Sequence, residues 1–265
     1  DGSPSPFWTT NAVAAWWFAR SVNGENYGGH AQHDACAVLA ADIDLENIEW
    51  TPVGNVSSHS SDSFYTGIFD GNGHTVSNLK VSSSLNRFFG GLFGGLDGNA
   101  TIKNLGVVNA EITAFGGAGA IAGGTTLEEN TVTITHCYAA NVVLAAPGGN
   151  YNAGGFIGGM WGTKSECGIS NSFAYNISIS SDTMNRGYFV GYSAIVRNSY
   201  CYYNSAVNAT ETTGITATAD EFSSGKIAYL LNGSVDHGSD WYQTLGGESS
   251  DLYPVLDSTH GKVFR

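Results

Sequence analysis

Small and apolar residues recur along this chain in short strings, and each string is followed by a strand-like alternation of apolar and polar residues. The clearest copy occupies residues 90–107, where Gly91-Leu92-Phe93-Gly94-Gly95 precedes Ile102-Lys103-Asn104-Leu105-Gly106-Val107. Four weaker copies begin at Gly67, Gly119, Gly155 and Gly187. Their spacing of roughly 25 to 35 residues indicates a solenoid, a propeller or an array of repeats. The chain is therefore predicted to be a repeat protein.

The recurring residue types have a physical reason in a β-solenoid. Successive coils stack about 4.8 Å apart, so each position meets its counterpart in the next coil. Glycine beside an apolar pair lets neighbouring backbones approach closely. The predicted inner stack contains Phe69, Phe93, Ile157 and Phe189. The predicted corner residues are Asn78, Asn104, Asn171 and Asn198, because asparagine tolerates the left-handed backbone of a tight turn.

His136 takes the place of the corner asparagine in one coil. We interpret it as a corner residue as well. The alternative, that it is a ligand or a catalytic group, stays open.

Helical patterns occur near both ends of the chain. Apolar residues at helical spacing after Asn11 predict a helix over residues 12–20. Its adjacent Trp16 and Trp17 suggest a sugar-stacking platform, but neighbours on a helix point about 100° apart. We therefore expect this helix to cap the solenoid with at least one indole buried. Thr218 and Glu221 have the spacing of a capping box and predict a second, short helix.

The expected organisation is one elongated domain, because each coil of a repeat array buries its apolar face only against its neighbours. Residues 1–35 form an N-terminal cap, residues 36–207 the coils, and residues 208–265 a C-terminal cap made of a helix and a closing strand.

The string Gly-Gly-Leu-Phe-Gly-Gly at residues 90–95, with its Ile-x-Asn-Leu-x-Val follower, resembles the GLUG motif. This motif is found in extracellular bacterial proteins and in the repeat regions of some IgA-cleaving peptidases. Residues 41–54 and 67–76 are similar to the opening turns of such proteins, and residues 222–256 to the closing segment of Bacteroidetes-type surface proteins that carry the motif. The resemblance covers nearly the whole chain. It implies a right-handed parallel β-helix with a surface or adhesive role, and it supplies no catalytic residues.

Composition and charge narrow the class of protein. With 36 glycines in 265 residues and only 12% charged residues, the chain favours strands and turns. Its net charge of −13 excludes a simple nucleic-acid or anionic-membrane surface. No apolar stretch approaches the roughly 18 residues of a membrane span. The chain begins at Asp1, which fits either a removed signal peptide or trimming. We expect it to lie outside the cell or on the cell surface.

The cysteines and the glycosylation sequons leave two questions open. Cys137, Cys167 and Cys201 are spaced by about one coil, which allows a disulfide between neighbouring coils, although a buried thiol acting as a small apolar group is the alternative. Cys36 completes an even number without CxxC spacing, which argues against zinc. The sequons at Asn55, Asn99, Asn176, Asn208 and Asn232 are glycan sites only in a eukaryotic secreted protein.

Two sets of residues are candidates for ligand binding. Asp42 and Asp44 alternate onto one face of a strand, and together with Asp70 they suggest a structural Ca²⁺ site, with turn capping as the alternative. No other cofactor is expected. Insertions between the coils carry Glu128, Tyr151, Trp161 and Glu166. If these loops project from one side they form a carbohydrate groove; otherwise they are unrelated surface loops.

No catalytic signature stands out, because HExxH, GxSxG and paired aspartates are all missing from the sequence. We therefore expect a secreted or cell-surface adhesion or glycan-binding module without catalytic activity, whose partner is an extracellular glycan or a host or cell-surface protein. The first alternative is a polysaccharide-degrading β-helix enzyme, a glycosidase or lyase, because two acids from different coils need no sequence signature. The second is a structural subunit of a surface filament or matrix, either self-associating or part of a larger surface protein.

Overall fold

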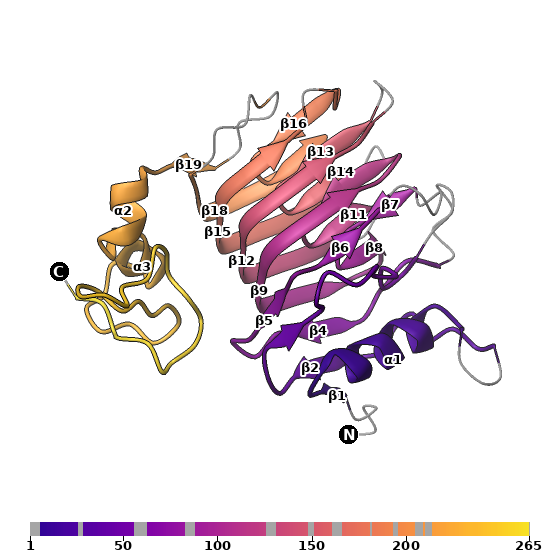
Figure 1. Ribbon diagram of the computed structural model, residues 1–265, viewed down its shortest axis with the longest axis horizontal. Helices are drawn as coiled ribbons and strands as arrows, with labels where there is room; N and C mark the ends of the chain where they lie inside the picture. The colour runs from indigo at the N-terminus through magenta and orange to yellow at the C-terminus, as the bar shows by residue number, and fades with distance from the viewer. Residues whose placement is uncertain are drawn as a thin grey trace.

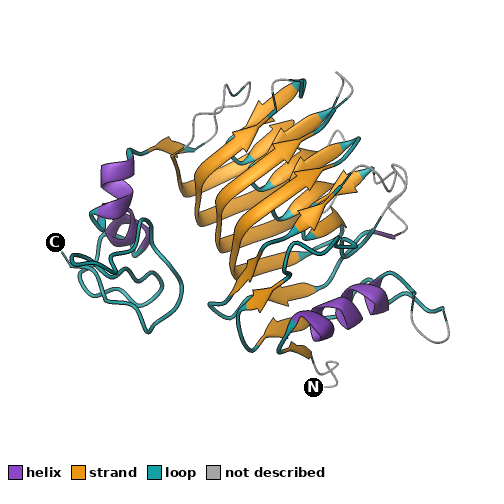
Figure 2. Cartoon of the chain, viewed as in Figure 1, coloured by secondary structure: helices purple, strands orange, loops and turns teal. Residues whose placement is uncertain are grey.

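A computed structural model describes residues 6–25, 29–55, 63–82, 88–125, 131–147, 151–160, 166–180, 182–192, 196–204, 209 and 214–264. Its parallel strands stack coil upon coil into a β-solenoid, as Figure 1 and Figure 2 show. The predicted fold class is therefore confirmed. No helix among the described residues is long and apolar enough to cross a membrane.

The described strands form one long sheet and two short ones. The long sheet contains β1 (Phe7–Thr9), β2 (Ala37–Leu39), β3 (Ile43–Asp44), β4 (Ile68–Asp70), β5 (Thr75–Ser77), β6 (Lys80–Val81), β9 (Thr101–Thr113), β12 (Thr131–Ala145), β15 (Glu166–Ile179), β18 (Val196–Asn204) and β19 (Ile215–Thr216). One short sheet contains β7 (Phe89–Gly90), β10 (Gly117–Gly119), β13 (Asn152–Gly154) and β16 (Asn185–Gly187). The other contains β8 (Phe93–Leu96), β11 (Ala122–Thr125), β14 (Ile157–Met160) and β17 (Val190–Tyr192).

The repeated glycines bring the two short sheets into direct backbone contact. A side chain at Gly123 would collide with the backbone nitrogen of Gly90, and one at Gly158 with the backbone nitrogen of Ala118. The four residues of the predicted inner stack, Phe69, Phe93, Ile157 and Phe189, are all buried in the core of the coils. They do not form one stack, because Phe69 lies in the long sheet opposite Ile102, and Val190 instead of Phe189 aligns with Ile157. The repeated strings thus supply both the close approach and the apolar filling.

Helix α1 (Ala12–Val22) lies against the first coils, at the N-terminal end of the stack (Figure 1). The side chain of Asn11 accepts a hydrogen bond from the backbone N–H of Ala14, at 2.9 Å, as the predicted cap requires. The ring of Trp16 packs edge-on against buried Trp50, whereas Trp17 is 57% exposed. The strand β1 precedes this helix and pairs with β2. The long sheet therefore begins at Phe7, before residue 36, the predicted start of the coils.

The long strands bend at two corners, and each corner carries its own ladder of left-handed residues. The strand registers align Asn104, His136, Asn171 and Tyr200, which we call the first corner ladder. They align Asn78, Asn109, Asn141 and Asn176 as the second corner ladder. Amide side chains bond from coil to coil there: Asn141 Nδ2 donates to Asn109 Oδ1 at 3.3 Å, and Asn176 Nδ2 donates to Asn141 Oδ1 at 2.8 Å.

This arrangement corrects the predicted set of corner residues. Asn104 and Asn171 share a corner, but Asn78 belongs to the other one. Asn198 pairs with Ile169 within the strand, and Tyr200 occupies the corner of that coil with a φ of 52°. The prediction failed because asparagine occurs at both corners, and only the strand register shows which corner each asparagine occupies.

Of the two alternatives for the cysteines, the structure shows the buried thiol in place of the disulfide, since Cys137, Cys167 and Cys201 are free. Cys167 lies opposite Val132, five residues along the strand from Cys137. Cys201 does share a position with Cys137, but Ser172 of the intervening coil lies between them. Two coil spacings amount to about 9.6 Å, which exceeds the Cα separation a disulfide spans. Burial raises the pKa of all three thiols to about 12.

The C-terminal segment, residues 217–264, lies beside the coils in Figure 1, next to the bends of β9, β12 and β15. Thr218 forms the predicted capping box with Glu221 at the start of α2 (Ala219–Ser223), and α3 (Lys226–Leu231) follows with Asn232 as its C-cap. Tyr242 makes antiparallel bridges to Val255 and Lys262. The segment packs on rings from successive coils, so it braces the stack from the side.

Candidate functional site

The C-terminal segment meets the first corner ladder at a polar cleft of about 340 Å³. Among the described residues, the coils contribute Asn72, Gly73, Asn104 and His136 to its lining, and the C-terminal segment contributes Ser239, Asp240 and Leu256. We call this the ladder cleft. Amide, imidazole, hydroxyl and carboxylate groups all face it.

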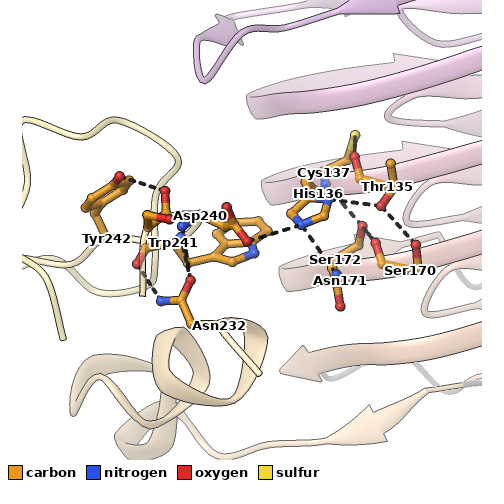
Figure 3. Close-up of polar contacts among 11 residues, drawn as sticks. Thr135, His136, Cys137, Ser170, Asn171, Ser172, Asn232, Asp240, Trp241 and Tyr242 are labelled. Atoms are coloured by element: carbon orange, nitrogen blue, oxygen red, sulfur yellow. Dashed lines mark hydrogen bonds and ion pairs between the residues drawn. The ribbon is translucent and has the colours of Figure 1, made fainter. Parts of the chain in front are cut away.

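His136 is held in the cleft by polar groups on both ring nitrogens (Figure 3). Its Nδ1 lies 3.0 Å from the Thr135 hydroxyl, which itself accepts a hydrogen bond from the Ser170 hydroxyl at 2.9 Å. Its Nε2 lies 3.3 Å from Asn171 Nδ2 and 3.8 Å from Asp240 Oδ2. Because Asn171 Nδ2 can only donate, the neutral imidazole accepts at Nε2 and donates from Nδ1 to Thr135.

Burial lowers the pKa of His136 below its ordinary value, and the nearby Asp240 carboxylate opposes this shift. The neutral ring is therefore the form that the fold favours near pH 7. Both nitrogens of this neutral ring are engaged by Thr135 and Asn171, so His136 shapes the wall of the cleft and leaves no nitrogen free for a ligand.

The opposite wall of the cleft is positioned by Asn232. Its Oδ1 accepts hydrogen bonds from the backbone N–H groups of Asp240 and Trp241, and its Nδ2 donates to the Trp241 carbonyl at 2.8 Å (Figure 3). These bonds hold the backbone of Asp240 and Trp241 in place.

An aromatic seam beneath the cleft holds the two walls together. Tyr138 and Phe173 stack at 5.0 Å on the outer side of the coils, and Trp241 packs against both, at 6.1 and 5.4 Å. Phe222 and Tyr253 of the C-terminal segment add contacts to Phe173 at 5.4 and 5.9 Å. These rings form a second apolar cluster, separate from the core of the coils.

The three aspartates predicted to bind Ca²⁺ serve the turns instead. Asp44 Oδ1 accepts hydrogen bonds from the Glu46 backbone and from Asn78, and Asp70 Oδ1 from the Asn72 backbone and from Asn104. Asp42 Oδ1 accepts a hydrogen bond from the backbone N–H of Thr75. Asp70 also pairs with Lys103, at 3.1 Å.

Each of these carboxylates therefore accepts a hydrogen bond from the next coil, from Asn78, Asn104 and Thr75 respectively. No group of three or more His, Cys, Asp or Glu side chains within the described ranges could hold a metal ion. This corrects the predicted metal site in favour of turn capping.

The predicted loop groove stays a prediction. Trp161 and Glu128 lie outside the described residues. Tyr151 is half-buried, with its ring 6.3 Å from that of Phe88, and Glu166 is the first residue of β15, opposite Thr131.

The sequence suggested two residues of the ladder cleft, His136 and the corner residue Asn104, but no local signal indicated Asp240 as the partner of His136. Asp240 follows His136 by more than a hundred positions in a segment without repeats. Only the docking of that segment on the coils places the two side chains together.

Comparison with known proteins supports the fold and one distant relationship. A search of protein-family models finds no match. The crystal structure of a candidate immunoglobulin A1 protease from Bacteroides ovatus is similar with a TM-score of 0.54 and 19% identity, over 96% of this chain and 92% of that chain. At that identity the likeness concerns the fold alone.

A curated relative is halomucin from Haloquadratum walsbyi, which is 35% identical over 134 residues, or 48% of this chain. The chain spans about 1% of the length of halomucin. The similarity therefore concerns a small part of a very long protein.

Proposed function

We propose that this chain is a secreted or cell-surface module that binds an extracellular glycan in the ladder cleft and carries out no chemistry. The observation that carries the proposal is the composition of that cleft: amide, imidazole, hydroxyl and carboxylate groups around an open volume of about 340 Å³. Sugar hydroxyls donate and accept hydrogen bonds, and the amide, hydroxyl and carboxylate groups offer complementary partners.

Several groups of the cleft are held in place before any ligand arrives. His136 is fixed by Thr135 and Asn171, Asn104 by its bond to Asp70 at 3.0 Å, and the backbone that carries Asp240 by its hydrogen bond to Asn232. Preorganised groups lose little conformational freedom on binding, which favours affinity for a polar ligand.

The comparisons and the motif resemblance support an extracellular setting. Halomucin is named as a mucin, and the GLUG resemblance points to surface proteins of bacteria. A glycosidase of the common kind needs two carboxyl groups that flank the scissile bond. Among the described lining residues, Asp240 is the one carboxylate, so the ladder cleft supports binding better than hydrolysis.

The test is a glycan array probed with the purified chain, followed by titration of each hit and an assay for reducing sugar. Asp240→Asn removes a charged acceptor, and a hydrogen bond to a charged group contributes about 1.5–3 kcal/mol. We expect glycan affinity to fall about 10- to 100-fold in this variant.

Glu111→Gln is the matched control, because it neutralises an exposed carboxylate on β9 away from the cleft. Equal affinity in both variants, or no bound glycan, would contradict the proposal. Release of reducing ends would replace it with the enzyme alternative.

A further inference from the structure

A second groove, of about 310 Å³, lies on the outer face of α1. The described residues that line it are Val13, Trp16, Trp17 and Arg20. The ladder cleft shares none of these residues, so the two sites can be perturbed separately.

The two indoles of this groove have different roles. Trp16 packs edge-on against Trp50 at 5.4 Å, and the Trp50 Nε1–H donates to the Leu92 carbonyl at 3.0 Å, so the core of the first coils holds Trp16 in place. Trp17 is exposed to solvent next to it, and Val13 adds an exposed apolar side chain one turn earlier. The groove therefore has a rigid wall on one side and a solvent-exposed indole on the other.

Arg20 brings a positive charge to this aromatic face. Its guanidinium carbon lies 5.8 Å from the centre of the Trp17 ring, and one of its nitrogens donates to the Glu25 carbonyl at 3.1 Å. Within the described part of the chain, no ion pair joins Arg20 to a carboxylate. Acidic residues outnumber Lys and Arg by 23 to ten, so an arginine at a groove without an acidic partner is notable.

We propose that this groove binds a carboxylated sugar, such as a hexuronate unit of an acidic polysaccharide. The apolar face of the pyranose would stack on Trp17, and its carboxylate would pair with the remaining guanidinium donors of Arg20. Arginine suits this role because its planar fork matches the geometry of a carboxylate. The charge complementarity selects an acidic sugar over a neutral one, and the site acts independently of the ladder cleft.

The experiment is calorimetric titration of the intact chain with a short oligogalacturonate and with the same oligomer as its methyl ester, which has the same rings without the charge. We expect the acidic oligomer to bind more tightly, and added salt to weaken its binding but not that of the ester. Arg20→Gln should weaken the acidic oligomer about tenfold or more and leave the ester unchanged. Trp17→Ala should weaken both.

Control variants separate this site from other sources of binding. Trp8→Ala removes another exposed indole, outside the groove, and Lys262→Gln removes an exposed charge in the C-terminal segment. Both should bind like the parent chain, as should Asp240→Asn if the ladder cleft plays no part. Because Trp17 and Arg20 are exposed, their variants should keep the melting temperature of the parent.

Three results would overturn the proposal: no binding of the acidic oligomer, equal affinity for the acid and the ester, or unchanged affinity in Arg20→Gln. Concentration-dependent self-association that disappears in Trp17→Ala would also overturn it, because a second copy of the chain would then be the occupant of the groove.

Discussion

Replacing Phe173 with alanine should release the C-terminal segment from the coils. The Phe173 ring is fully buried, yet it lies outside the core of the solenoid and contacts Phe222, Trp241 and Tyr253 of the C-terminal segment. A buried Phe→Ala substitution costs about 3–5 kcal/mol. Most of the rings that lose a contact with Phe173 belong to the C-terminal segment. The substitution should therefore lower mainly the free energy with which this segment docks on the coils.

This magnitude predicts a change that hydrogen exchange can measure. A loss of about 3–5 kcal/mol raises the population of the undocked segment by roughly 10²- to 4 × 10³-fold, since each 1.4 kcal/mol is a factor of ten. Amides of α2 and α3 should therefore exchange faster by that factor, while amides of β12 and β15 keep most of their protection.

Phe156→Ala provides the matched comparison, because Phe156 is equally buried but packs on Phe189 inside the coils. It should lower protection in the coil strands instead. If Phe173→Ala reduced protection equally in the coils and in the C-terminal segment, or left α2 and α3 unchanged, the aromatic seam would not be what holds the segment in place.

Three further outcomes follow from the ladders and the buried thiols. Asn141→Ala should lower the free energy of unfolding by about 2–3 kcal/mol, through a left-handed backbone and two lost hydrogen bonds between exposed side chains, and Asn141→Gly by only about 1 kcal/mol; equal urea midpoints would refute this. Because the pKa of His136 is lowered in the folded state, the unfolded chain binds more protons below pH 7, and the free energy of unfolding should fall from about pH 7 to 5. The His136→Asn variant should lose less stability over that range. Identical losses for the variant and the parent in urea titrations would contradict the lowered pKa of His136. A thiol reagent should modify half-buried Cys36 first, and rapid reaction of Cys137, Cys167 or Cys201 in the folded chain would contradict their burial.

The spacing of the motif was sufficient to predict the solenoid, because successive coils stack residues of the same type on one another. Phe93, Ile157 and Val190 recur at one coil position, and the glycines beside them allow the close backbone contact of the short sheets. The helix after Asn11 and the capping box of Thr218 could also be predicted from the sequence, because a capping residue and the helical turn that it stabilises are neighbours in sequence.

The tertiary structure alone decided how these elements combine. Asn78 and Asn104 share a sequence pattern, yet they sit on different corners because strand register, which the pattern does not encode, assigns them. His136 and Asp240 face each other only because aromatic rings dock a segment without repeats onto the coils. Local periodicity thus determined the coil, whereas contacts between distant, non-periodic residues determined the cleft.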